Sequence, residues 1–118
     1  MDGEIDGPEL QALIEDDTEL TVVDIRRPGT FEQGHIPGSV NVPFGELPNR
    51  IDDVADADRV VTVCPHGKAS VKAARLVGSY REFDGRVESL RGGLEAWEGP
   101  VEAAADQGTD DEGPAAPF

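Results

Sequence analysis

A chain of 118 residues supports one domain of ordinary size with a hydrophobic core, and it needs no disulfide to fold. Asp and Glu outnumber Lys and Arg by 25 to 10, and the formal net charge of −15 excludes nucleic acid and anionic membrane surfaces as partners. The sequence has one cysteine, no apolar run long enough to span a bilayer and an acidic first segment unlike a signal peptide, so we expect a cytoplasmic protein.

Lysine is scarce, since Lys68 and Lys72 are the only two in the chain. Together with the acidic excess, this scarcity favours a halophilic protein, because acidic surfaces stay hydrated in salt and molar salt shortens the Debye length to about 3 Å. We therefore expect a higher melting temperature in molar KCl than in dilute buffer. A lower one would leave an acidic tail and a solvated face as the explanation.

Hydrophobic periodicity and turn residues divide the first hundred residues into alternating strands and helices. The most explicit local signal is a helix start in which Asp6 is the N-cap and Glu9 completes a capping box. Connections too long for hairpins predict an α/β domain with a mainly parallel sheet and helices on both faces. In chain order we expect strands at 4–5, 20–26, 40–43, 60–63 and 86–90, and helical segments at 7–14, 31–32, 47–54, 70–80 and 94–97.

The composition changes after the last of these segments. From about Ala103 onward the residues are mainly Ala, Asp, Glu, Gly and Pro, with no periodicity and no Lys or Arg. Such a segment cannot bury enough apolar surface to order itself. We therefore predict a folded domain at 1–101 and an acidic, disordered tail at 102–118.

The single cysteine, Cys64, ends the apolar run 60–63 and precedes a loop and a helix that begins near Ser70. The carboxyl end of a parallel strand is where open α/β sheets bind ligands, and the start of the helix would direct free N–H groups and its positive dipole end into the loop. Those groups and Lys68 favour the thiolate, which is the nucleophilic form. The competing interpretation is inert packing, the usual role of an isolated buried cysteine.

Other charged residues allow two interpretations each. Lys68 and Lys72 lie at i and i+4 beside the thiol, where they either recruit an anion or form an ordinary helix-surface pair. Asp24 and Arg26 leave the same predicted strand, where they either pair as a structural support behind the loop or contact the substrate directly, and we expect the pair. One Cys and two His do not make a convincing ligand set, so we expect no metal and no cofactor.

Four segments, taken in order and spacing, resemble the rhodanese-like family of sulfurtransferase domains: 22–26, 34–43, 63–64 with its loop and helix, and 90–93 followed by Trp97. The resemblance covers nearly everything from Glu4 to Pro100. It implies a doubly wound α/β domain whose loop cysteine, here Cys64, takes a sulfane sulfur from a donor such as thiosulfate and passes it to a thiophilic acceptor. Backbone N–H groups would stabilise the anionic donor and persulfide in a cradle formed by Pro65, His66, Gly67, Lys68, Ala69 and Ser70.

The chain departs from the family pattern at Ala69, where many members place an arginine five residues after the cysteine. Lys68 compensates only in part, since lysine is a flexible point charge where arginine is a fixed fork. The Cys-x-His-Gly opening is nevertheless similar to short single-domain thiosulfate sulfurtransferases, which also lack that arginine. His66 either donates to the bound anion or shapes the loop, while His35 and the pair formed by Asp24 and Arg26 are expected to be structural supports.

Three functions follow from these observations. The leading hypothesis is a thiosulfate-type sulfurtransferase that works through a Cys64 persulfide on a small sulfur-containing anion. The alternative is a non-catalytic binding or sulfur-relay module that docks on a protein sulfur donor or acceptor, and Ala69 is the feature that favours it. A Cys-dependent phosphatase or arsenate reductase ranks third, because it would need an arginine fork where Ser70 stands.

Overall fold

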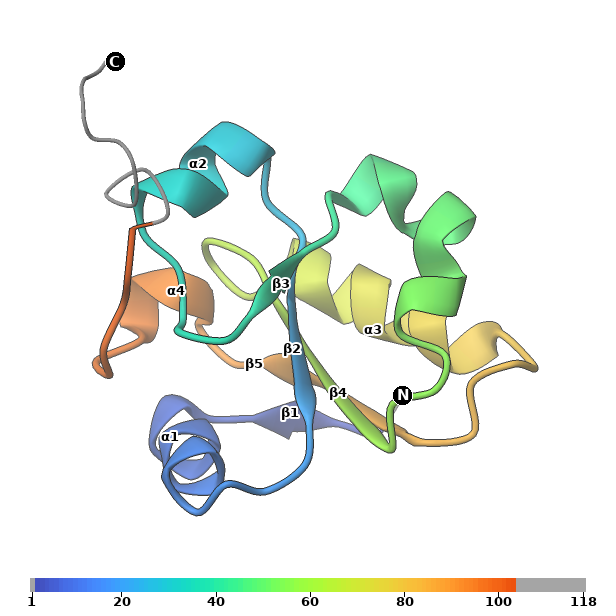
Figure 1. Cartoon of the computed structure of the whole chain (residues 1–118), viewed down its shortest axis with the longest axis horizontal. Helices are drawn as coiled ribbons and strands as arrows, with labels where there is room; N and C mark the ends of the chain where they lie inside the picture. Colours follow the sequence, from blue (N-terminus) through green and yellow to red (C-terminus); the bar gives the residue numbers. More distant parts are fainter. Residues whose placement is uncertain (1, 104–118) are drawn as a thin grey trace.

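The computed structural model describes residues 2–103 and shows a five-stranded, all-parallel sheet in the order β1-β5-β4-β2-β3 (Figure 1). This architecture confirms the predicted α/β class with a parallel sheet. The strands are β1 Glu4–Ile5, β2 Thr21–Asp24, β3 Val40–Asn41, β4 Arg59–Val63 and β5 Arg86–Leu90. The helices are α1 Gly7–Glu15, α2 Pro28–Gln33, α3 Ala69–Ser79 and α4 Gly93–Ala96, with a 3₁₀ segment, η1, at Phe44–Asp53.

Two hydrophobic clusters cover the two faces of the sheet, so helices lie on both sides as predicted. One cluster joins β2, β4 and β5 to α3 and η1, and the other joins β1, β2, β4 and β5 to α1 and the α4 region. Leu10 of α1 and Trp97, which caps α4, belong to the second cluster. The first cluster includes Ala73, Ala74 and Val77, which form the buried face of α3.

The central strand β4 is buried on both faces, which explains its continuous apolar sequence. Side chains alternate along a strand, so Val60, Thr62 and Cys64 face α3, while Val61 and Val63 face the opposite cluster. Cys64 follows directly after β4 and therefore enters the space between the sheet and the start of α3.

The start of α1 forms as the sequence predicts. Asp6 is the N-cap, its side chain accepts a hydrogen bond from the Glu9 N–H at 2.9 Å, and Glu9 accepts in return from the Asp6 N–H. Both halves of the capping box are therefore present, and they fix the direction in which the chain leaves β1.

Several elements differ from the predicted boundaries. The helical turn expected at 31–32 is the longer helix α2, and the extended segment expected at 40–43 is the two-residue strand β3. Two further differences have a local reason. The helix expected at 47–54 is instead a 3₁₀ segment at Phe44–Asp53, in which the backbone angles of Arg50 are non-helical. Pro48 lies inside this segment, and it lacks the N–H that a continuous α-helix requires. The strand expected at 20–26 ends at Asp24. The Arg26 N–H donates to the Asp24 carboxylate at 3.0 Å and not to a backbone carbonyl of a neighbouring strand, so the strand pairing stops there.

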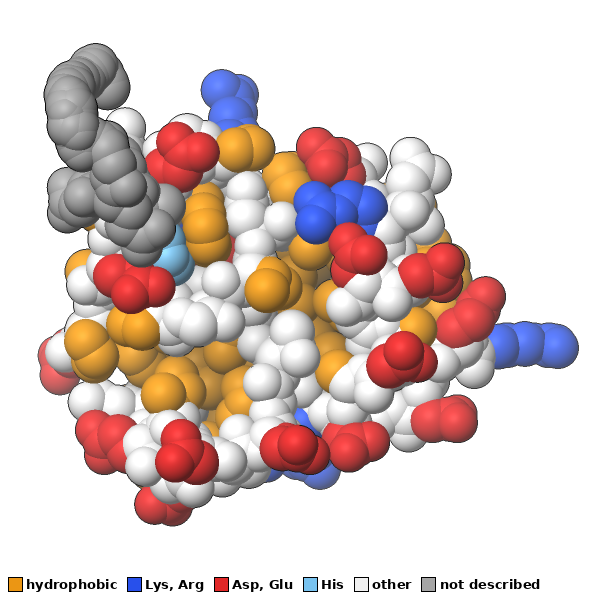
Figure 2. All heavy atoms as spheres, viewed as in Figure 1, with side chains coloured by type: hydrophobic (Ala, Val, Ile, Leu, Met, Phe, Trp, Pro, Cys, Tyr) orange, Lys and Arg blue, Asp and Glu red, His pale blue; other side chains and the backbone are white. Residues whose placement is uncertain are grey.

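The face of the molecule in Figure 2 carries many Asp and Glu side chains and few Lys or Arg, as the formal charge of −15 leads one to expect. No helix within residues 2–103 is both long enough and apolar enough to cross a membrane. Glu102, the first residue of the predicted tail, exchanges backbone hydrogen bonds with His35 at 2.8 and 2.9 Å. The predicted disorder of residues 104–118 lies outside the described residues.

Candidate active site around Cys64

The Cys64 side chain lies between the end of β4 and the first turn of α3, and the residue is only 2% exposed. Residues 65–68 form the intervening loop, and Lys68 occupies the N-cap position of α3 without a side-chain capping bond. The free N–H groups at the start of this helix are therefore available to the loop, and the positive end of the helix dipole lies beside the thiol.

Three groups surround the Cys64 Sγ within hydrogen-bond distance. The Gly67 N–H donates to Sγ at 3.0 Å and the Ser70 N–H donates at 3.3 Å. The Ser70 hydroxyl lies 3.3 Å from Sγ, and because a hydroxyl rotates it can accept from the thiol or donate to the thiolate. The arrangement is a small anion cradle built mainly from backbone groups.

This cradle sets the acidity of the thiol. Burial raises the pKa of Cys64, but the hydrogen bonds from the Ser70 hydroxyl and from the backbone N–H groups of Ser70, Gly67 and His66 together outweigh it. The pKa of the Cys64 thiol is therefore lower than its ordinary value. At neutral pH a larger fraction of Cys64 is therefore in the nucleophilic thiolate form than of a cysteine with an ordinary pKa.

The loop is held in place by the segment that follows β5. The N–H of Leu94 donates to the Cys64 carbonyl at 2.8 Å, and the N–H of Glu95 donates to the Pro65 carbonyl at 3.0 Å. Gly67 has φ +84, and a Cβ there would lie 2.7 Å from the nitrogen of Gly92. A glycine is therefore required at 67, both for its conformation and for this close approach of two loops.

The rim of the cradle is formed by exposed side chains. Pro65, His66, Lys68 and Ala69 are all solvent-exposed, and the His66 Nδ1 lies 3.3 Å from a carboxylate oxygen of Glu95 on α4. The His66 ring is therefore directed to the rim, and the hydrogen bonds to Sγ come from Gly67 and Ser70. Of the six residues predicted to form the cradle, only Gly67 and Ser70 are buried beside Sγ.

The structure brings Asp24 and Arg26 together as the predicted pair. The Arg26 guanidinium makes contacts of 2.7 to 3.1 Å with both carboxylate oxygens of Asp24, and it also donates to the Gly34 carbonyl at 2.7 Å. Asp24 lies opposite Val63 in the parallel pairing of β2 with β4. The pair therefore lies next to the strand that carries Cys64, and its described hydrogen bonds go to the 24–41 region and not to the thiol.

His35 belongs to a different part of the molecule from the cradle. Its ring stacks on Phe31 at 3.8 Å, its Nδ1 lies 2.7 Å from the Phe31 carbonyl, and its Nε2 lies 3.4 Å from a carboxylate oxygen of Glu102. These contacts join α2 to the end of the described chain. They agree with the expectation that His35 holds backbone segments together.

The sequence did not single out two hydroxyl groups behind the cradle. The Ser89 Oγ on β5 lies 2.7 Å from the Ser70 Oγ, and the Thr62 Oγ1 on β4 donates to the Ser70 carbonyl at 2.7 Å. All three residues are fully buried. The available signal was a polar residue on the same face as Val60 in β4 and as Val87 in β5, and this position alone does not reveal the contact that each hydroxyl makes.

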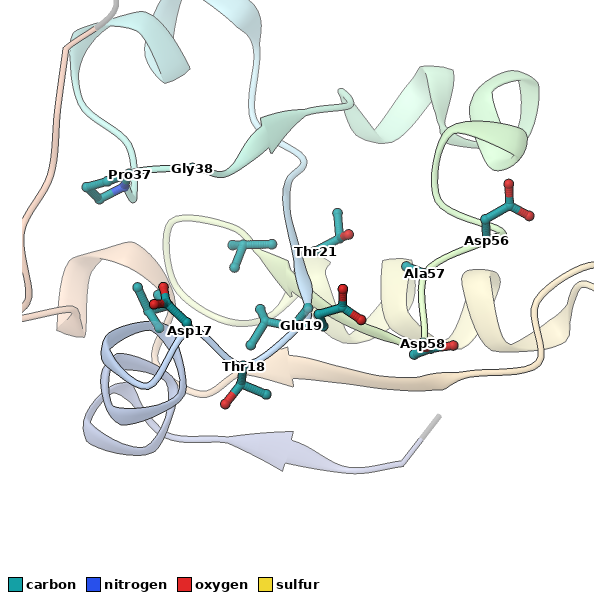
Figure 3. A pocket seen from close by; sticks show the side chains of 12 residues that line it. Asp17, Thr18, Glu19, Thr21, Pro37, Gly38, Asp56, Ala57 and Asp58 are labelled. Atoms are coloured by element: carbon teal, nitrogen blue, oxygen red, sulfur yellow. The ribbon is translucent and has the colours of Figure 1, made fainter.

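A hollow of about 500 Å³ lies at the opposite edge of the sheet from Cys64 (Figure 3). Its walls include Thr21, the first residue of β2, and Asp58, which precedes β4, so it lies at the amino ends of the strands. Four carboxylates line it and would repel an anionic sulfur donor. They belong to Asp17, Glu19, Asp56 and Asp58. Within residues 2–103, no group of three or more His, Cys, Asp and Glu residues is placed to hold a metal ion.

Known proteins share this architecture and sequence pattern. The chain matches the Rhodanese-like domain family over residues 6–100. A sulfurtransferase from Allochromatium vinosum is 34% identical over 97 residues, which cover 82% of this chain and 89% of the relative. Thiosulfate sulfurtransferase GlpE from Shewanella oneidensis is 43% identical over 79 residues, which cover 66% of this chain and 75% of the relative.

The Alr3790 protein from Anabaena sp. has a crystal structure that superposes with a TM-score of 0.75 at 26% identity, covering 86% of this chain and 83% of that chain. The strand order, the loop that carries Cys64 and these similarities lead to one conclusion. The chain belongs to the rhodanese-like domain family.

Proposed function

We propose that this protein is a sulfurtransferase that carries sulfane sulfur as a persulfide on Cys64. The observation that supports the proposal is the environment of the only cysteine in the chain. Its Sγ accepts one backbone N–H bond from Gly67 in the loop and one from Ser70 in the first turn of α3, and it lies beside the Ser70 hydroxyl. This environment lowers the pKa of the thiol, and it leaves a cradle suited to a small anion. Relatives named as sulfurtransferases agree with it.

The chemistry needs no redox partner when thiosulfate is the donor. The Cys64 thiolate attacks the outer sulfur of thiosulfate, a new sulfur–sulfur bond forms, and the original one breaks as its electron pair leaves with sulfite. A thiophilic acceptor such as cyanide then attacks the terminal sulfur of the persulfide, which returns Cys64 as the thiolate. Negative charge remains near the loop in both steps, where the N–H groups of Gly67 and Ser70 stabilise it.

The same loop is poorly suited to phosphate or arsenate chemistry. The position six residues after Cys64 holds Ser70, whose side chain is buried and hydrogen-bonded to Ser89, and no guanidinium comes from the loop residues 65–69. Transfer of a phosphoryl group needs bidentate donors on its equatorial oxygens. A sulfurtransferase therefore fits the site better than a Cys-dependent phosphatase.

The test of the proposed activity is steady-state turnover of thiosulfate with cyanide, measured as thiocyanate formed. Wild-type protein should turn over, while the Cys64→Ser variant should show no rate above the uncatalysed background, because a serine hydroxyl is not ionised at neutral pH. Circular dichroism of both proteins serves as the folding control. Equal turnover by the two proteins would disprove a role for Cys64.

The second candidate is a sulfur-relay module that receives its sulfur from a partner protein. Ala69 favours it, because this exposed position supplies no charge with which to orient a small free anion. A relay module should turn over thiosulfate slowly and should accept sulfur rapidly from a protein persulfide such as that of a cysteine desulfurase. Comparing the two donors at equal concentration separates the relay from the free enzyme.

Restoring an arginine at the rim should improve the use of thiosulfate. Position 69 is exposed and is the first residue of α3, so the Ala69→Arg variant can place a guanidinium over the cradle without disturbing the core. We expect KM for thiosulfate to fall about tenfold, because a hydrogen bond between the arginine guanidinium and the thiosulfate anion contributes roughly 1.5 kcal/mol to binding. Ala69→Gln is the uncharged control. An unchanged KM in the arginine variant would mean that the backbone cradle already suffices.

A further inference from the structure

Behind Cys64 the hydroxyl of Ser70, which belongs to the cradle, is continued by a second buried hydroxyl to which the proposed reaction assigns no role. The Cys64 Sγ is 3.3 Å from the Ser70 Oγ, which in turn is 2.7 Å from the Ser89 Oγ. Both serines have no exposed surface, so water does not compete for these bonds. Ser70 is the second residue of α3 and Ser89 lies near the end of β5, so the two hydroxyls join the helix to the neighbouring strand.

We propose that Ser89 is a positioning residue for Cys64: its hydroxyl holds the Ser70 hydroxyl in the orientation that donates to the Cys64 sulfur. The short contact between the two serines carries this inference, because a Ser70 oxygen that accepts from Ser89 must direct its own hydrogen elsewhere, and Sγ is the neighbour within reach. Ser89 then acts on the sulfur only through Ser70.

The direction of the hydroxyl chain follows the charge on the sulfur. When Cys64 is a thiol, it donates to the Ser70 oxygen and Ser70 donates to Ser89. When Cys64 is a thiolate, both hydroxyls turn, so that Ser89 donates to Ser70 and Ser70 donates to Sγ. Two aligned hydroxyl dipoles then point at the anion. Each hydrogen bond strengthens the other, because both lie in a buried region of low dielectric constant. The thiolate therefore gains more from the chain than the neutral thiol, which is a weak donor.

The ionisable groups on the elements that pack around Cys64 are the same in the wild type and in every serine variant. They lie on the loop, on α3, on α4 and at the end of β2. They are His66, Lys68, Lys72, Glu95 and the pair of Asp24 with Arg26. A shift in the titration of Cys64 between the serine variants can therefore be assigned to the hydroxyl chain.

The experiment measures the rate of Cys64 alkylation by iodoacetamide as a function of pH, in the full chain. Cys64 is the only thiol, so the midpoint of the profile reports its pKa directly. Removing the direct donor in Ser70→Ala should raise the midpoint by about one pH unit, and removing the second hydroxyl in Ser89→Ala should raise it by about half a unit. A Ser89→Ala midpoint equal to or below that of the wild type would overturn the proposal.

A double-mutant cycle tests whether Ser89 acts through Ser70. In the Ser70→Ala background, Ser89→Ala should cause no further shift, since the intermediate hydroxyl is already absent. Additive shifts would mean that Ser89 reaches the sulfur by another route, and would contradict the proposal.

The Thr62→Val variant is the matched control for packing, because Thr62 is equally buried and its hydroxyl also bonds to Ser70, but at the carbonyl. Its midpoint should equal that of the wild type. A shift as large as that of Ser89→Ala would show that any loss of a buried hydroxyl near α3 has this effect, and would refute the positioning role.

The inference rests on Cys64 reacting as a thiolate, as the proposed function does, but the two can fail separately. Alkylation requires no sulfur donor, so the pH profiles remain informative even for a protein that turns over no thiosulfate. Conversely, normal turnover by the wild type together with an unshifted profile in Ser89→Ala would support the proposed function and contradict the positioning role of Ser89.

Discussion

Gly93→Ala should lower the free energy of unfolding by about 3 kcal/mol, because it combines backbone strain with a backbone clash. Gly93 has φ +65, and an added Cβ would contact the Cys64 carbonyl and lie 2.6 Å from both the Gly67 nitrogen and the Pro65 carbonyl carbon. None of these atoms is the end of a flexible side chain, so the Cys64 loop itself must move. We expect the alkylation midpoint of Cys64 to rise as the Gly67 N–H leaves the sulfur.

Urea denaturation and the alkylation profile measure the two effects. The matched control is Gly29→Ala, since Gly29 lies in α2 with no heavy atom within 4 Å of an added Cβ. That variant should be as stable as the wild type or slightly more stable. If Gly93→Ala unfolds at the same urea concentration as Gly29→Ala, the contact between α4 and the loop does not hold the site.

Arg26→Met should destabilise the protein by about 3 kcal/mol, because it leaves the buried Asp24 carboxylate without its partner. Asp24 is 1% exposed and the Arg26 side chain only 9% exposed. The loss also removes the 2.7 Å bond to the Gly34 carbonyl, which ties β2 to the end of α2. Turnover per folded molecule should stay at the wild-type value, since the described hydrogen bonds of Arg26 do not reach the sulfur.

Two comparisons sharpen this prediction. Arg50→Met removes a guanidinium that pairs with Glu46 and Asp53 in exposed positions, and it should have a much smaller effect on unfolding. Adding Asp24→Asn to Arg26→Met should recover part of the stability, because the unpaired charge disappears. A folded Arg26→Met protein with greatly reduced turnover would instead assign Arg26 to the reaction and not to the support of β2.

The sequence was sufficient for the parts of the fold that depend on neighbouring residues. The capping box of Asp6 with Glu9, the strand that ends just before Cys64 and the helix that follows can each be predicted from a short segment, and the structure contains all three. The pairing of Asp24 with Arg26 could also be predicted, since two residues of opposite charge lie only two positions apart, although the strand ends at Asp24 and the pair forms in the turn that follows it.

The features that could not be predicted from the sequence depend on contacts between residues that are far apart in the chain. Ser89 is 19 residues from Ser70, and only the pairing of β5 with β4 beneath α3 brings their hydroxyls together. Gly93 is the first residue of the short helix α4, and nothing in its local sequence indicates that the carbonyl of Cys64 lies against it. The 3₁₀ segment around Pro48 was expected as a helix because apolar spacing alone does not distinguish these helix types over so few turns.

The central claim is that Cys64 carries sulfur, and the mass of the intact protein tests it most directly. After incubation with thiosulfate and removal of the excess, wild-type protein should gain the mass of one sulfur atom, and cyanide should remove it. Cys64→Ser, treated in parallel, should gain nothing. A wild-type protein whose mass does not change, or an equal gain in Cys64→Ser, would contradict the persulfide mechanism.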